Sequence, residues 1–172
     1  MASLMEDLID VLTKEHLEYE KLLELSKKKT PIIVKGSVVE LQQITDEEQF
    51  VVERVSHLEK KRNEVLNDIA TVINKDVNSL KIMNLIQLLG KQPVEQKKLS
   101  IIYDKLKSTL SDMMIINTNN RELIQQSLEM VEFDMNLIQA MRQAPETADY
   151  NKGAYSAGNV MGMNKGGFDA KQ

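Results

Sequence analysis

The chain has 172 residues, of which 42% are hydrophobic, and a net charge of −4 from 22 basic and 26 acidic side chains. This length suffices for one domain with a buried core. Because charges of both signs are mixed along the chain, no positive field is available to hold a polyanion, which makes nucleic acid a poor partner. The sequence contains no cysteine, which excludes disulfides, thiolate metal sites and thiol catalysis.

The N-terminal segment MASLMEDLIDVL is acidic and amphipathic, which is not typical of a signal peptide. No apolar run approaches the roughly 20 residues that a membrane span requires. We therefore expect a cytoplasmic protein without membrane insertion. The three Phe, four Tyr and no Trp favour helices packed through aliphatic side chains and Met over a β-sandwich.

The first apolar pattern has helical spacing and precedes Pro31. Its members are Met5, Leu8, Leu12, Tyr19 and Leu22. Because proline interrupts helices, Pro31 and Gly36 predict a loop after this helix. Pro93 and Pro145 predict two further element boundaries.

A second pattern with near-heptad spacing predicts a helix from about Val38 to Ile73. Glu48 and Arg62 interrupt its apolar seam. If the two helices fold antiparallel about a loop at Pro31, Glu48 comes near Glu15 and His16. We expect these polar residues to set the register of the helices or to reach solvent.

A short apolar cluster between Leu80 and Leu89 predicts a short helix that ends at Gly90 and covers one end of a bundle. A long helical pattern begins at Pro93 and meets the polar residues Asn117 to Asn120. Asparagine is a mediocre helix former but not a helix breaker, so we expect the helix to continue through them.

Two apolar rows follow on this last helix, between Arg121 and Met141. The first apolar row, typical of a core-facing helix, comprises Ile124, Leu128, Val131, Met135 and Ile138. The second apolar row comprises Leu123, Met130, Phe133, Leu137 and Met141. Either the helix lies between neighbours and is buried on two sides, or the second apolar row is covered by a helix of another protein. Methionine suits surfaces that adapt to different apolar partners.

From Pro145 onward the chain is rich in glycine, and its composition cannot bury enough surface to offset the entropy of ordering. We therefore expect two parts, a helical domain over residues 1–144 and a flexible tail over 145–172. The fold class is all-α: an antiparallel helical bundle or coiled coil of about three long helices plus a short one. The tail is either dispensable or a docking segment that uses tyrosine.

The sequence contains no pattern typical of a catalytic or metal site. Neither His16 nor His57 follows a glutamate at the Glu-x-x-His spacing of di-metal helical bundles. Gly36 and Gly90 are too far apart to form a phosphate-binding loop. We expect no cofactor, no metal and no enzymatic activity.

The helical pattern resembles the FlgN family of flagellar type III export chaperones. In the first two helices the matching residues are Glu15, Tyr19, Leu22, Leu25, Leu41, Glu48, Leu58, Glu59 and Arg62. In the last helix they are Asn117 and Asn120, followed by Leu123, Ile124 and Leu128. The resemblance covers roughly residues 4 to 140, and its weight lies in the order and spacing of these motifs.

This resemblance implies a cytoplasmic chaperone that masks the C-terminal amphipathic helices of the hook-filament junction proteins FlgK and FlgL and delivers them to the export gate. We expect the second apolar row, Leu123, Met130, Phe133, Leu137 and Met141, to bind the client helix. The family also docks to the export gate through its C-terminal segment, where Tyr150 and Tyr155 are the candidates. Before its client is added, such a chaperone is a small monomer or homodimer.

Two other classes of function are consistent with the same pattern. A coiled-coil adaptor or structural oligomer would explain the helices and the polar residues in the seam equally well. A helical protein that sequesters a transcription factor is the other alternative.

Overall fold

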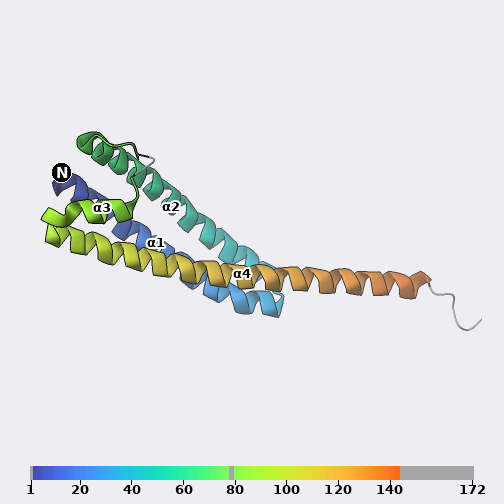
Figure 1. The fold of residues 1–172 in the computed structure, drawn as a ribbon. Helices are drawn as coiled ribbons and strands as arrows, with labels where there is room; N and C mark the ends of the chain where they lie inside the picture. The colour runs from blue at the N-terminus through green and yellow to red at the C-terminus, as the bar shows by residue number, and fades with distance from the viewer. Residues whose placement is uncertain (1, 78–79, 144–172) are drawn as a thin grey trace, which may run out of the picture. The chain divides into compact units, whose positions relative to one another are not determined.

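The computed structural model describes residues 2–77 and 80–143, and all the regular structure in this part of the chain is helical (Figure 1). The elements are α1 (Ala2–Lys35), α2 (Val38–Ile73), α3 (Ile82–Leu88), a 3₁₀ turn (Leu89–Lys91) and α4 (Pro93–Gln143). The predicted all-α fold of three long helices and a short one is therefore confirmed. The expected tail, residues 145–172, lies outside the described residues.

The chain divides into two compact units, Met1–Ser127 and Leu128–Gln172. The first unit contains α1, α2, α3 and α4 as far as Ser127. In the second unit, the described residues are the last part of α4. The expected functional division into residues 1–144 and 145–172 stays a prediction.

The prediction that Pro31 ends the first helix is wrong, because Pro31 lies inside α1. The side chain of Ile33 is buried and Ile32 packs on the core beside Leu22 and Leu25, so burial holds the helix together past the proline. The chain reverses instead at Gly36, whose φ of +72° favours glycine. Ser37 then caps α2 by accepting a hydrogen bond from the Glu40 N–H.

The first helix packs on both long neighbours within the first unit. Side chains from α1, α2, α3 and α4 form one core cluster, to which Met5, Leu8, Ile69, Leu85 and Leu99 belong. A second cluster joins α1 and α2 nearer their connecting turn, with Leu22, Val51 and Val55 as members. The predicted apolar faces of the first two helices are thus confirmed as core faces, apart from the exposed Val72.

Polar contacts give the directions of the helices. Arg54 bonds to Glu18, whereas Arg62, later in α2, bonds to Glu15, earlier in α1, so α2 runs antiparallel to α1. Along α4 the order is reversed: Thr109 contacts His16 at 3.2 Å and Asn120 contacts Ser26. The fourth helix therefore runs parallel to α1 within the first unit.

The predicted proximity of Glu48 to Glu15 and His16 is wrong. Glu48 pairs with Lys29, and the Ser26 hydroxyl donates to it. Glu15 pairs with Arg62 instead, at 2.8 Å. The reason is the position of the turn: because α1 continues past Pro31 to Lys35, each residue of α1 faces a later residue of α2.

The α4 helix continues through Asn117 to Asn120, as predicted. Asn120 is buried, and its Nδ2 donates to the backbone carbonyl of Ser26 at 2.9 Å. Its Oδ1 accepts from the Thr30 hydroxyl at 2.6 Å. This amide therefore fixes the position of α4 along α1, a role that its place in a polar patch does not reveal.

We predict that Asn120→Ala lowers the free energy of unfolding by about 1–3 kcal/mol, because it removes the hydrogen bonds that join Asn120 to Ser26 and Thr30 of α1 and leaves a gap where the buried amide packed. Asn119→Ala is the matched control, since Asn119 is exposed in the same turn of the helix. Its effect should stay within about 0.5 kcal/mol. Urea denaturation of both variants measures the difference, and equal effects would contradict the assigned role of Asn120.

A second prediction concerns Glu15, which is fully buried. Burial raises the pKa of Glu15 above 4.5, although the ion pair with Arg62 partly offsets this effect. A raised carboxyl pKa stabilises the fold at low pH, and this stabilisation is lost as the pH rises through the folded-state pKa. Compared with Glu15→Gln, which does not ionise, the wild-type protein should lose free energy of unfolding as the pH rises above 4.5.

Urea titrations of wild type and Glu15→Gln at a series of pH values give this difference directly. All other ionisable groups are common to both proteins, so the contributions of those that do not interact with Glu15 cancel. A difference that does not change with pH would show that Glu15 does not titrate as described.

Candidate functional site

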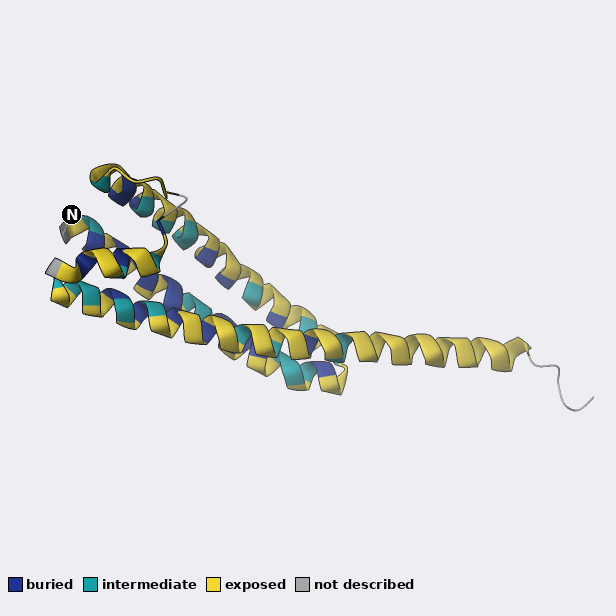
Figure 2. Cartoon of the chain, viewed as in Figure 1, coloured by how far each residue is buried: buried dark blue, intermediate teal, exposed yellow. Residues whose placement is uncertain are grey.

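The second apolar row lies on α4, and four of its five members belong to the second unit. Leu123, in the first unit, is half-buried. Met130, Phe133, Leu137 and Met141 are 49–70% exposed. Figure 2 shows the same end of α4 as exposed throughout. The described part of the chain therefore leaves this apolar surface accessible.

The first apolar row was expected to face the core, and this expectation is wrong for most of it. Ile124 is half-buried, but Leu128, Val131, Met135 and Ile138 are 51–59% exposed. Their spacing of three and four residues is typical of a helix covered by other helices. In the described part of the chain, however, no side chains cover these four residues.

The two rows lie on different faces of one helix. At about 100° per residue, their centres are separated by about 130° around the helix axis. Asp134 lies between the rows, and Glu132 flanks the first apolar row on its other side. Over residues 128–143 the helix carries three acidic side chains and one basic side chain, so this apolar segment is also acidic.

A seam between α2 and α4, with α1 as its floor, carries two grooves of the first unit. One groove, of about 520 Å³, has Leu22 of α1, Val52 of α2 and Met113 of α4 in its lining. The other, of about 410 Å³, is lined by side chains that include Tyr19 and Leu110. We call this surface the α2–α4 seam. Helical periodicity alone does not predict this surface, because the surface depends on the separation of α2 from α4 in the folded chain.

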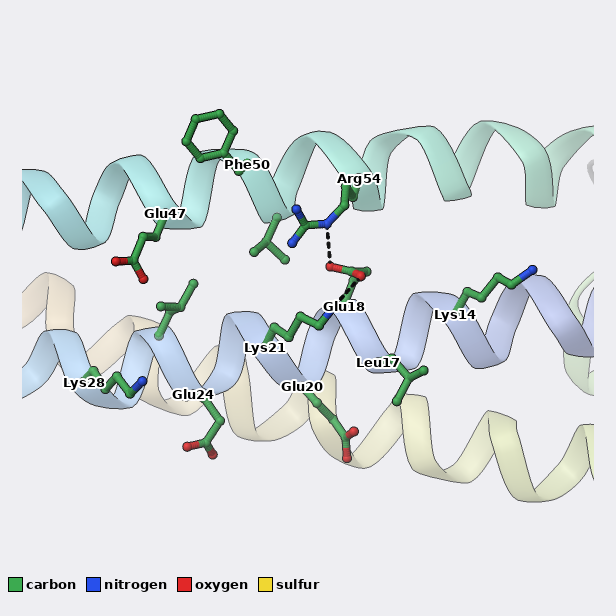
Figure 3. Close-up of a pocket in the computed structure, with 12 residues that line it drawn as sticks. Lys14, Leu17, Glu18, Glu20, Lys21, Glu24, Lys28, Glu47, Phe50 and Arg54 are labelled. Carbon is green, nitrogen blue, oxygen red and sulfur yellow. Dashed lines mark hydrogen bonds and ion pairs between the residues drawn. The ribbon is translucent and has the colours of Figure 1, made fainter.

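Another groove, of about 720 Å³, lies between α1 and α2 (Figure 3). Glu18 sits across it, between Lys21 at 2.7 Å and Arg54 at 2.9 Å. Burial raises the pKa of Glu18, but the hydrogen bonds from Lys21 and Arg54 outweigh burial and lower it below the ordinary value. The charges that line this groove are balanced, with four acidic and four basic side chains. Existing ion pairs thus occupy the middle of this groove.

Polar side chains between α1 and α2 bond to one another, although the buried Oε1 of Glu15 accepts no hydrogen bond from the described residues. The Tyr19 hydroxyl donates to Glu59 at 3.0 Å, and burial together with this hydrogen bond raises the pKa of Tyr19 to about 12. Glu15 is held by Arg62. Over residues 2–77 and 80–143, no group of three or more His, Asp or Glu side chains is placed to hold a metal ion. These contacts join α1 to α2, and the expected role of such polar residues in setting the register of the helices stays a prediction.

The tyrosines expected to dock to the export gate, Tyr150 and Tyr155, lie outside the described residues. Within the described ranges, none of the helices has both the length and the apolar composition needed to cross a membrane.

A helical domain that exposes two apolar rows on one long helix is typical of proteins that bind the helices of other proteins. The family model described as FlgN protein matches residues 1–156, so the chain belongs to the FlgN family. No curated protein and no solved structure matches the chain. The FlgN family is one of flagellar export chaperones, which is the kind of role that membership gives this protein.

Proposed function

We propose that this chaperone masks the C-terminal amphipathic helices of the hook-filament junction proteins FlgK and FlgL in the cytoplasm, and delivers them to the flagellar export gate. Such helices expose an apolar face before they assemble, and covering that face prevents aggregation and premature polymerisation. Membership of the FlgN family supports this role.

The observation that carries the proposal is the exposure of the second apolar row. Met130, Phe133, Leu137 and Met141 repeat at spacings of three and four residues, which is the spacing that a helix uses to contact another helix. Three of these side chains are more than 60% exposed. A client helix laid along this row would remove them from water and gain hydrophobic stabilisation in doing so.

The composition of the row suits more than one client. Methionine is unbranched and flexible, so Met130 and Met141 can adapt to apolar side chains of different shapes. Phe133 supplies a large ring of the kind that often dominates the energy of an interface. One row can therefore serve two junction proteins whose terminal helices differ in detail.

We predict that Met130→Glu combined with Leu137→Glu abolishes binding of the C-terminal fragments of FlgK and FlgL, because two charges would be buried without partners. The affinity should fall about 100-fold or more in isothermal titration calorimetry. The far-UV helical signal should not change, since both side chains are exposed in the folded chain.

Leu128→Glu combined with Met135→Glu is the matched control. These two residues have the same spacing of seven and a similar exposure, but belong to the first apolar row. The control should bind the client as wild type does. If both double variants bind like wild type, the client does not use this end of α4. If only the control loses binding, the client uses the first apolar row.

For delivery to the export gate we propose Tyr150 and Tyr155 as docking residues. A tyrosine ring fills a pocket with little loss of conformational entropy. Tyr150→Ala combined with Tyr155→Ala should therefore weaken capture of the export gate component in a pull-down while client binding stays intact. Capture equal to that of wild type would exclude these tyrosines.

A further inference from the structure

The first apolar row continues the face through which α4 packs in its own unit. Leu99, Leu106 and Asn120 lie on this face and are buried. The same spacing of three and four residues leads on to Leu128 and Ile138, which are exposed. We expect Leu128 and Ile138 to be covered by a surface similar to the one that covers the earlier part of this face in the first unit. That surface is formed by helices with apolar side chains flanked by charged ones.

The α2–α4 seam is such a surface, and it lacks a covering element in the described residues. Val52 on α2 and Leu110 on α4 line its grooves with 45% and 43% of their surface exposed. Leu22 and Tyr19 of α1 form the floor between them. Grooves of this size accept the side chains of one face of a helix rather than its backbone.

The charges of the seam and of the first apolar row are opposite. Four basic and two acidic side chains line the seam. Arg62 and Lys29 are held by carboxylates of the same unit. Lys107 and Arg121 have no ion-pair partner among the described residues. Glu132 and Asp134, which flank the first apolar row on either side, likewise have none in the described part of the chain.

The lengths also agree. The floor of the seam extends along α1 from Leu12 to Lys29, which corresponds to about 27 Å of helix. Residues 128–143 of α4 form about 24 Å of helix. A second copy of the chain therefore supplies a helix of the right length, the right apolar spacing and the right charge.

We propose that the first apolar row of one copy packs into the α2–α4 seam of a second copy, and that the exchange is reciprocal. The client-free protein is then a twofold dimer in which each copy contributes one row and one seam. The α1–α2 groove is the poorer match, because its charges are balanced and already paired across its middle. This inference does not depend on the identity of the client, since the second apolar row stays free.

Sedimentation velocity of the full chain over a range of concentrations tests the dimer. Wild type should reach twice the chain mass of 19.6 kDa. Leu128→Glu combined with Met135→Glu should remain monomeric, with a self-dissociation constant about 100-fold larger or more. Met130→Glu combined with Leu137→Glu should dimerise as wild type does. Far-UV circular dichroism and urea denaturation confirm that each variant is folded.

A charge exchange tests the seam itself. Lys107→Glu combined with Arg121→Glu reverses two cations of the seam, and Glu132→Lys combined with Asp134→Lys reverses the acids beside the row. Each variant alone should dimerise more weakly than wild type, because like charges then face each other. An equimolar mixture should recover the dimer, because both of its contacts again join opposite charges.

Several results would overturn the proposal. They are a wild type that stays monomeric at every concentration, a Leu128/Met135 variant that dimerises normally, and a mixture no more dimeric than its components. If the Lys107/Arg121 variant dimerises normally but loses FlgK binding, the seam binds the client instead of a second copy. These outcomes are separate from the client experiment, in which the Met130/Leu137 variant is decisive.

Discussion

The structure depends on one constraint: the other helices are too short to cover the whole length of α4. The fourth helix has 51 residues, whereas α1, which packs along it, has 34. Leu8 near the start of α1 and Leu99 near the start of α4 share one core cluster, and the two helices run in the same direction within the first unit. The apolar spacing of α4 nevertheless continues to Met141. Its last turns therefore carry apolar side chains that the described part of the chain leaves exposed.

The fold was largely predictable from the sequence, because three long amphipathic patterns separated by turn residues allow few arrangements. The bounds of α2 and the start of α4 at Pro93 follow directly from these patterns. The prediction at Pro31 is wrong because the local preference of proline against helix is outweighed there by the burial of Ile33, two residues later. That one error moved the turn to the wrong place, and it therefore also paired Glu15 with Glu48 instead of Arg62.

The candidate site was only partly predictable, for a different physical reason. A surplus of apolar residues on α4 is visible in the sequence, and the second apolar row came from it. Periodicity shows that Leu128 and Met135 suit a helical partner, but not whether the same chain provides that partner. The α2–α4 seam is beyond such reasoning, because Val52 and Met113 are distant in sequence and line one groove only after folding. The role of Asn120 likewise becomes visible only in the folded chain, where Ser26 and Thr30 lie beside it.

The separation of the two rows has a consequence for how the chaperone holds its client. With about 130° between their centres, two helices can contact the same stretch of α4 without competing for the same side chains. If the first apolar row is occupied by a second copy and the second apolar row by a client, client binding leaves the dimer contacts in place. Asp134, which lies between the rows, borders both surfaces, so a client helix with a basic flank would gain from it and an acidic one would not. In that arrangement the charge of the client's flank contributes to which helices this chaperone accepts, because many amphipathic helices present a similar apolar face.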